Sequence, residues 1–344
     1  MKTIMIGLDI AKNVFQVHGV DEAGRVVHRR QLRRGQLEAF FAKLAPAVVG
    51  MEACGGAHHW GRLFESLGHE VRLMAPAYVK PYVKRNKTDG RDAEAICEAM
   101  QRPNMRFVAV KSVEQQAVMA LHRTRSLLVC QRTQAANALR AIFAEFGVVA
   151  APGAKGLRGL IAMLGDLSAV PPLAVEPMVR LARQWEAFDA DIEALERRIV
   201  AAARGNDAAR RLMEIPGVGP ISASAVLAAV PDARLFRSGR GFAAWLGLTP
   251  RQNNSGDKRR SGGISKQGER HIRTLLILGA SAHLRHEPHR KDKDPWLTGL
   301  MARRPVKVAA VARAAKTARI IWALLSRGDR YRAGERNRAQ ARPA

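Results

Sequence analysis

Four carboxylates in the N-terminal part of the sequence have the residue types and positions of metal ligands. Asp9 lies within an apolar stretch, Glu52 directly follows another, and Asp89 and Asp92 are three residues apart at the start of a predicted helix. A carboxylate inside an apolar strand is costly unless it is paired or coordinates a cation. Two acidic residues three apart share one helix face, although acidic residues at a helix start are also common as caps. The pattern predicts the binding of a divalent cation.

The overall charge indicates which substrate such a centre would meet. The 344 residues include 57 Lys and Arg against 30 Asp and Glu, a formal net charge of +27. An excess of this size predicts a polyanionic partner, most simply a nucleic acid. Beside a polyphosphate, clustered carboxylates suit Mg²⁺, with two ions about 4 Å apart that activate a nucleophile and stabilise the leaving oxygen of a phosphodiester.

A membrane surface is the competing polyanion. No apolar run approaches the roughly 20 residues of a spanning helix, and the first residues show no secretory signal pattern. Cys54, Cys97 and Cys130 form no Cys-x-x-Cys pair, so neither a zinc site nor a disulfide framework is indicated. We therefore expect a cytoplasmic, nucleoid-associated protein with no membrane partner.

The predicted secondary structure places two of the four carboxylates on a sheet. Its strand and helix patterns describe a β-hairpin followed by alternating helices and strands, which is typical of an α/β fold with a mixed sheet. The predicted strands are 4–10, 14–20, 25–32, 47–51 and 70–74, and the predicted helices are 36–44, 60–67 and 93–100. Asp9 falls in the first strand and Glu52 at the carboxyl end of the fourth, where α/β folds usually bind ligands.

Three short segments carry a resemblance to a known family. Gly-Leu-Asp-Ile-Ala-Lys at 7–12, Met-Glu-Ala at 51–53 and Lys-Thr-Asp-Gly-Arg-Asp-Ala at 87–93 resemble the Asp-Glu-Asp-Asp motif of bacterial insertion-sequence transposases with a RuvC-like domain, also called bridge recombinases. The resemblance continues into the C-terminal half and covers most of the chain. It implies an RNase H-like fold for residues 1–105, in which Asp9, Glu52, Asp89 and Asp92 are catalytic and hold Mg²⁺. It also implies donor and target DNA, a structured noncoding guide RNA, and a homo-oligomer, either a dimer or a tetramer.

Residues 106–204 are expected to form a helical linker. One helix is predicted at 112–146 and a second one ends at Arg204. The apolar residues of the second helix alternate steps of three and four, which is typical of a coiled-coil seam and equally of one face of an intramolecular helical hairpin. They are Met178, Leu181, Trp185, Phe188, Ile192, Leu195, Ile199 and Ala202. In the resembling family this region joins the two catalytic modules and mediates dimerisation.

The C-terminal domain, predicted for residues 205–327 and all-α, begins with a glycine-rich turn. Gly217 and Gly219 precede an alanine-rich helix at 221–230, which resembles the helix-hairpin-helix that binds the DNA backbone. A purely structural turn between helices is the alternative. The basic tail 328–344 is predicted to be disordered.

A polar loop at residues 251–268 carries the candidate nucleophile. In the resembling family a serine of this region forms a covalent link to DNA, and we assign this role to Ser255, with Ser261 and Ser265 as alternatives. A serine hydroxyl needs a base or a metal to become nucleophilic, so this loop would have to meet the carboxylates, between different subunits.

Further residues are predicted to contact nucleic acid, because cations and glycine-rich turns suit phosphates. They are Lys87, Gly217, Gly219, Arg251, Lys258, Arg259, Arg260, Lys266, Arg270 and Arg273. The sequence from 283 to 289 contains His283, His286 and His289, and we predict a solvated or phosphate-contacting loop there because Pro288 interrupts the helix. The last predicted helix, 309–325, adds further cations. The added cations are Lys307, Arg313, Lys316 and Arg319.

Three functions account for these features. The leading hypothesis is a DNA transposase or recombinase that moves its own element, with Mg²⁺ held by the four carboxylates while Ser255 attacks a phosphodiester. The second is a RuvC-like junction nuclease that uses the same metal site to activate water. The third is a non-catalytic nucleic-acid scaffold, in which the acidic residues are helix caps.

Overall fold

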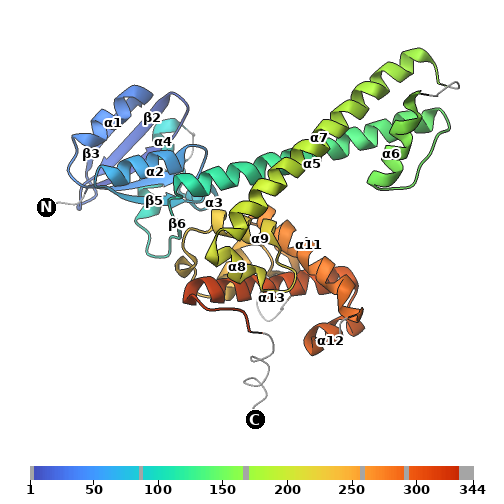
Figure 1. Ribbon diagram of the computed structural model, residues 1–344. Helices are drawn as coiled ribbons and strands as arrows, with labels where there is room; N and C mark the ends of the chain where they lie inside the picture. Colours follow the sequence, from blue (N-terminus) through green and yellow to red (C-terminus); the bar gives the residue numbers. More distant parts are fainter. Residues whose placement is uncertain (1–3, 85–87, 166–169, 256–259, 290–293, 333–344) are drawn as a thin grey trace, which may run out of the picture. The chain divides into compact units, whose positions relative to one another are not determined.

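The computed structural model describes residues 4–84, 88–165, 170–255, 260–289 and 294–332. The chain divides into two compact units, Met1–Gln115 and Gln116–Ala344 (Figure 1). The predicted segments 106–204 and 205–327 thus fall mostly within one compact unit.

The N-terminal unit contains a six-stranded mixed sheet in the order β3-β2-β1-β4-β5-β6. β1 (Met5–Asp9) pairs antiparallel with β2 (Val14–Val20), which pairs antiparallel with β3 (Val26–Arg33). On its other side β1 pairs parallel with β4 (Val48–Glu52), and β4 pairs parallel with β5 (Glu70–Met74). The short β6 (Phe107–Val108), which the sequence did not predict, closes the sheet antiparallel to β5. The predicted mixed sheet is confirmed, and it is consistent with an RNase H-like domain.

Helices cover both faces of this sheet. α1 (Arg34–Ala42) and α2 (Ala57–Ser66) share a core with the β1 and β2 side chains Leu8, Phe15 and Val17. The other face packs against α4 (Asp89–Met100), preceded by α3 (Pro76–Val79) and the 3-10 turn η1 (Lys80–Tyr82). α4 begins at Asp89, whereas the sequence predicted helix only from Ala93.

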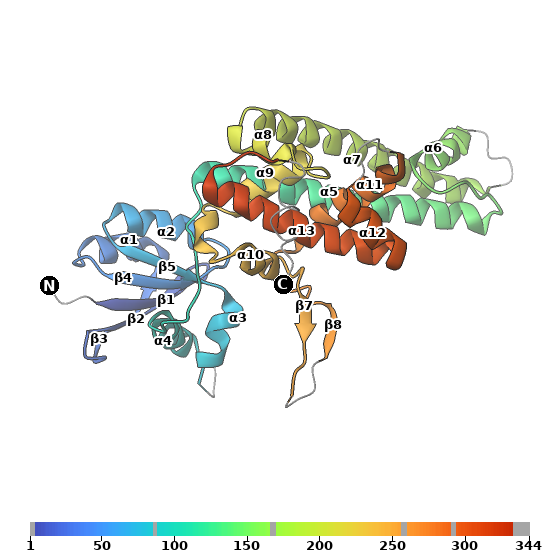
Figure 2. The same ribbon diagram turned by 90° about the horizontal axis from the view of Figure 1, so that it is seen from below.

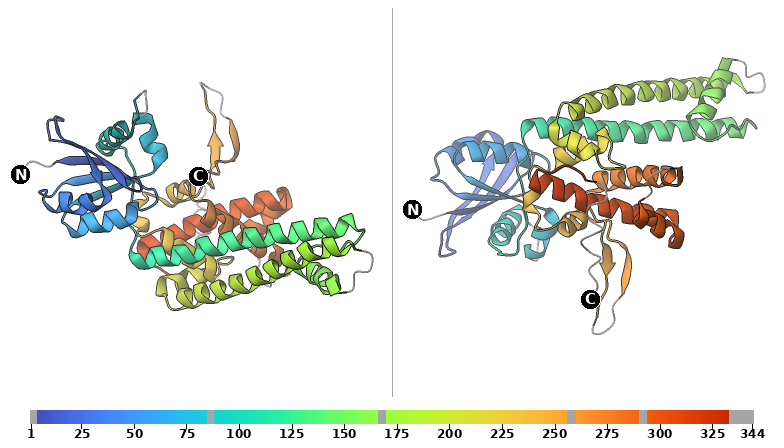
Figure 3. Two further views of the ribbon diagram at one scale, coloured as in Figure 1. Left: turned by 90° about the horizontal axis from the view of Figure 1, so that it is seen from above. Right: turned by 60° about the horizontal axis from the view of Figure 1, so that its bottom comes forward.

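Two long helices, α5 (Val113–Glu145) and α7 (Pro172–Arg204), run side by side in the C-terminal unit (Figure 3). The Arg125 guanidinium donates twice to Glu196 Oε1, from Nε at 2.8 Å and from NH2 at 2.5 Å, and Arg132 pairs with Asp189. α6 (Ala154–Ala162) and the 3-10 turn η2 (Met163–Gly165) pack near the connection. The helical-hairpin alternative therefore describes this chain, and a supercoiled dimer remains a prediction.

The apolar seam of α7 differs in detail from the prediction. Met178, Trp185, Ile192 and Ile199 are buried as expected, but at the C-terminal end Ala203 is buried and Ala202 is exposed. A straight α-helix has about 3.6 residues per turn, so an apolar line drifts away from a strict seven-residue repeat.

The rest of the C-terminal unit is a helical bundle around α13 (Val306–Arg327). It contains α8 (Asp207–Met213), α9 (Pro220–Ala229), α10 (Gly239–Trp245), α11 (Arg270–His286) and α12 (Pro295–Arg303), with 3-10 turns η3 (Ala233–Leu235) and η4 (Glu287–His289). β7 (Pro250–Gln252) and β8 (Ser261–Ile264) form a separate hairpin that extends from the bundle (Figure 2).

Candidate metal centre

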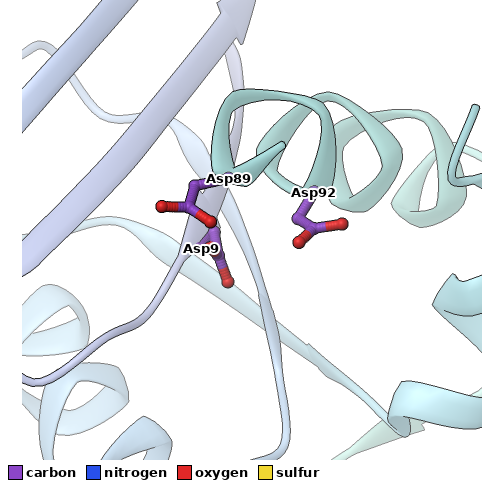
Figure 4. Close-up of side chains that lie close together, drawn as sticks. All are labelled: Asp9, Asp89 and Asp92. Atoms are coloured by element: carbon purple, nitrogen blue, oxygen red, sulfur yellow. The ribbon is translucent and has the colours of Figure 1, made fainter. Parts of the chain in front are cut away.

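Three of the four predicted ligands lie together in the N-terminal unit. Asp9 ends β1, and Asp89 and Asp92 lie in the first turn of α4 (Figure 4). One carboxylate oxygen from each residue lies within 4.8 Å of the other two. Asp9 and Asp92 are half-buried and Asp89 is exposed, so the cluster opens to solvent. Three closely spaced carboxylates fit a hard divalent cation, which binds oxygen ligands.

A glycine allows α4 to lie close enough to β1 for this arrangement. A Cβ on Gly7 would overlap the carbonyl oxygen of Ala93, so no larger residue fits while α4 keeps this position. Gly7 is two residues before Asp9, and alternate strand residues share one face. The close contact therefore places the first turn of α4 beside the Asp9 carboxylate.

The start of α4 is fixed by its main chain. Thr88 has an extended backbone, and its carbonyl oxygen accepts hydrogen bonds from the amides of Arg91 and Asp92 at 2.8 and 3.1 Å. Carboxylates in the first turn also complement the positive end of the helix dipole. Thr88 is the N-cap residue and its side chain makes no capping hydrogen bond, so Asp89 and Asp92 lie inside the first turn, where their charges suit the helix dipole and their oxygens can act as ligands.

Glu52 lies on the neighbouring strand but outside the group of three. It ends β4, which pairs parallel with β1 through Leu8 and Met51, so the ends of the two strands are adjacent. Cys54 lies near enough to both Glu52 and Asp9 for their negative charges to act on its thiol. The pKa of the Cys54 thiol is raised by burial first and then by the negative charges of Glu52 and Asp9.

Two glutamines that the sequence analysis did not consider extend this site. Asp9 pairs across the sheet with Gln16, and Gln16 pairs with Gln31 on β3. The Gln16 side-chain amide donates to Gln31 Oε1 at 3.2 Å. The polar Gln16 and His18 between apolar residues of β2 were the available signal.

The predicted nucleophile lies in the C-terminal unit on the β7–β8 hairpin. Ser255 is exposed, Ser261 begins β8, and Ser265 is half-buried with its amide donating to Thr249 O at 2.9 Å. The exposed Arg251, Arg260, Lys266 and Arg270 belong to the same hairpin and the segment that follows it. Lys87, Lys258 and Arg259 lie outside the described residues.

Three basic side chains do not fit the prediction of phosphate contacts. Arg273 is 8% exposed, and its NH1 donates to the carbonyl oxygens of Leu246 and Gln267 at 2.8 and 2.9 Å. Arg313 is 1% exposed within the helical core. His283 lies inside α11 and is buried, with Nε2 3.3 Å from the Glu287 carboxylate, so it is not part of a solvated loop. Burial removes these side chains from solvent, and their polar atoms make contacts within the fold.

The glycine-rich turn has a packing role at one of its two glycines. Gly217 has φ +89°, and a Cβ on Gly279 of α11 would overlap its carbonyl oxygen. Gly217 thus allows the turn and α11 to touch through their backbones. Gly219 precedes α9, and a Cβ there would meet no described atom within 4 Å, so open space remains at the start of that helix.

A mixed sheet with clustered carboxylates, in a chain of net charge +27, is consistent with a nucleic-acid-processing enzyme, and the comparisons specify the family. A DEDD transposase domain of IS110 type matches residues 6–147, and the family described as "Transposase IS116/IS110/IS902 family" matches residues 209–294. The chain belongs to the IS110/IS116/IS902 family of insertion-sequence transposases. Such a domain and the acidic cluster together indicate a divalent-metal site.

Relatives match over almost the whole chain. A protein of Pseudomonas aeruginosa named "Probable family 20 transposase" is 52% identical, over 97% of this chain and 100% of that protein. The transposase for insertion sequence element IS1111A of Coxiella burnetii is 44% identical, over 97% of this chain and 93% of the relative. The transposase for insertion sequence element IS1328 of Yersinia enterocolitica is 38% identical, over 94% of this chain and 97% of the relative. The chain is therefore a DNA transposase, in general terms an enzyme that cleaves and rejoins DNA.

No helix among the described residues is both long and apolar enough to cross a bilayer.

Proposed function

We propose that the Asp9, Asp89 and Asp92 cluster, with Glu52 beside it, is a Mg²⁺-dependent DNA cleavage centre. The observation that carries this proposal is the approach of three carboxylate oxygens to within 4.8 Å, in a segment matched by a DEDD transposase domain. Bound there, Mg²⁺ would stabilise negative charge on the oxygens of the phosphodiester. The protein contributes the fixed ligand positions through the contact of α4 with Gly7.

The proposed cleavage centre is tested by replacing its carboxylates with amides of equal size. Asp9→Asn and Asp92→Asn should lower DNA cleavage at least about 100-fold, because removal of a metal ligand costs more than removal of an outer partner. The same variants should weaken binding of Mn²⁺, measured by calorimetry without DNA. Glu38→Gln in α1 removes the same charge from an exposed position of a helix that packs on the opposite face of the sheet and should leave both unchanged. Unchanged cleavage by Asp9→Asn would refute the proposal.

Ser255 is the proposed nucleophile. Its Oγ forms a bond to phosphorus, the bond from phosphorus to the leaving sugar oxygen breaks, the serine proton passes to solvent, and the leaving oxygen takes up a proton. Ser255→Ala should then abolish the covalent protein–DNA adduct found after denaturation. Ser261→Ala and Ser265→Ala are the matched controls and should retain it.

The second candidate, a junction nuclease that activates water at the same carboxylates, predicts the opposite result. Cleavage by Ser255→Ala without any trapped adduct would favour the nuclease. A protein that binds DNA equally with and without Mg²⁺ and never breaks a strand would support the scaffold hypothesis instead.

The proposed partners are donor and target DNA, a structured noncoding guide RNA and further copies of this chain. The net charge of +27 supports nucleic-acid binding and a location at the nucleoid. The open start of α9 at Gly219 suits a helix-hairpin-helix contact with a DNA phosphate. Strand exchange measured with and without RNA transcribed from the flanks of the element tests the guide, and light scattering tests a dimer or tetramer, including pairing through α7.

A further inference from the structure

One face of the β2–β3 hairpin continues the candidate metal centre toward the edge of the sheet. The cross-strand register places Asp9 opposite Gln16 and Gln16 opposite Gln31. Directly paired residues of antiparallel strands point to the same face, and so do alternate residues of one strand. Arg29 and Arg33, two positions on either side of Gln31, therefore share the face of Asp9.

This face is open along β3. Arg29, Gln31 and Arg33 are all exposed, and only Leu32 of the strand is buried. β3 is the last strand at its end of the sheet order in the described part of the chain. The pKa of His18, opposite Arg29, is lowered by burial first; Glu94 raises it, and the positive charges of Arg29 and Lys84 lower it further. Both signs of charge therefore act at His18. Lys84 pairs with Glu94, and Arg29 and Arg33 are exposed cations of β3 on the face shared with Asp9.

The spacing and chemistry of these side chains suit a nucleic-acid backbone. Alternate residues of a strand are about 6.6 Å apart, so Arg29, Gln31 and Arg33 form a regular row of donors. Arginine and glutamine are common phosphate ligands. The row leads through the Gln16–Gln31 hydrogen bond directly to Asp9, whose carboxylate belongs to the cluster.

A charged edge strand has another common role, which is to prevent association with other sheets. Protection of the edge depends on charge along the strand and not on the face to which the charge points. Arg30 can therefore distinguish edge protection from DNA binding. It is exposed on the same strand but pairs with Val17, so it points to the face of the sheet that α1 and α2 cover. Arg30 carries the same charge at the same edge and points away from Asp9.

We propose that Arg29, Gln31 and Arg33, with Gln16, form a binding track for the backbone of the DNA strand that is cut at the carboxylate cluster. Gln16 and Gln31 act as positioning residues that hold the backbone beside the scissile phosphate, and the two arginines hold phosphates further along the strand. DNA is the occupant because the track is continuous with the proposed cleavage centre. The proposal rests on the proposed function for the identity of the strand.

The test places a photo-crosslinking amino acid, p-benzoylphenylalanine, at position 31 or, as the matched control, at position 30 of the full chain. Both crosslinking variants also carry Asp9→Asn, so that the DNA probe is not cleaved during the experiment. The probes are a labelled single-stranded DNA from the junction of the element with its flank and an RNA of the same sequence. Position 31 should crosslink to DNA and position 30 should not.

Affinity provides the second measurement. Arg29→Ala combined with Arg33→Ala should make the dependence of log K on log salt less steep by about 1.4, since each neutralised phosphate of a single strand contributes about 0.7. Arg30→Ala should leave the slope unchanged. Circular dichroism of each variant verifies that the fold is retained.

The outcomes separate this proposal from the proposed function. Equal DNA crosslinking at positions 31 and 30, equal effects of the double variant and Arg30→Ala, or crosslinking of position 31 to RNA but not DNA would each overturn the binding track. None of these results bears on the metal ligands. Conversely, full cleavage by Asp9→Asn alone would remove the cleavage centre, even where position 31 crosslinks to DNA.

Discussion

Basic side chains of α5 and α13 in the C-terminal unit and those of the β3 edge are used in opposite ways. In the C-terminal unit, Arg125 and Arg132 pair with acidic residues of α7, and Arg313 is buried in the core. On β3, Arg29 and Arg33 are exposed, and their side chains have no ion pair within the described residues. The two regions show that a large positive charge indicates a nucleic-acid partner for the whole chain, whereas burial and pairing decide which residues are available to it.

The largest effect on stability is expected at Arg313. Its NH1 lies 3.6 Å from Asp294 Oδ2, and its NH2 donates to Pro216 O at 3.4 Å. Arg313→Met should destabilise the protein by about 3 kcal/mol, because it removes a buried guanidinium together with its contacts to Asp294 and to the Pro216 carbonyl. Asp294 itself is partly exposed and keeps Lys316 as a partner. The exposed Arg319→Met on the same helix should cost less than about 0.5 kcal/mol. Urea unfolding followed by circular dichroism compares them, and similar losses would contradict the distinction by burial.

A buried histidine extends the comparison to pH. Burial first, then His271 and Arg125, lowers the pKa of His122 to about 4, and its Nε2 lies 3.1 Å from Ser224 Oγ. The unfolded chain takes up this proton near pH 6.5 and the folded chain only near pH 4. The contribution of His122 is therefore complete above pH 6.5 and is lost as the pH falls toward 4, by up to about 3 kcal/mol.

His122→Gln isolates this contribution, since glutamine can keep a hydrogen bond to Ser224 but does not titrate. Urea midpoints between pH 7.5 and pH 4.5 should fall less in this variant than in the wild type. Parallel curves for the two proteins would assign the pH dependence to other groups.

A smaller effect is expected in the helical hairpin. Asp189 accepts from Arg132, and its other oxygen is 3.1 Å from Arg158, with all three side chains partly exposed. Arg132→Ala should cost about 1 kcal/mol, near the upper end for a partly solvated ion pair. A double-mutant cycle with Asp189→Ala measures the coupling, and Arg183→Ala on the exposed side of α7 is the control. Zero coupling would mean that the Arg132–Asp189 pair does not stabilise the hairpin.

The smallest effect on stability is expected at the β3 edge. Arg29→Ala with Arg33→Ala should change the free energy of unfolding by no more than about 0.5 kcal/mol, because exposed side chains away from special features contribute little. DNA binding should change in the same variant. A large loss of stability would show that these arginines, like those of α7, serve the fold.

The sheet of the N-terminal unit was predictable because its strands carry local apolar and alternating patterns. The strands at 14–20 and 70–74 were predicted with their observed bounds, and the acidic residues were placed at the start of a helix. The start of α4 was predicted four residues late, because Asp89, Gly90 and Asp92 have weak helix propensities. The approach of Asp9 to Asp89 and Asp92 was expected from the family resemblance, whereas its cause at Gly7 lies in a contact distant in sequence.

Burial in the helical unit was less predictable. Arg273 and Arg313 look like surface cations in a helical sequence, and only the carbonyl and carboxylate groups of other elements explain their burial. The α7 seam fitted two partners equally, and its packing against α5 in a shared apolar core, with ion pairs such as Arg125 with Glu196, depends on contacts that are distant in sequence. Gly217 similarly acquires its packing role from Gly279 in another helix.

The contact of Gly7 with Ala93 has a consequence for the way copies of such an element are judged in genomes. A copy in which codon 7 has mutated to alanine would keep every carboxylate of its motif and would pass any inspection for catalytic residues. Its first α4 turn would nevertheless be displaced from Asp9, because the added methyl group would overlap the main chain. Such a copy would carry an intact motif on a displaced helix, so in this chain the glycine at position 7 has to be judged together with the carboxylates.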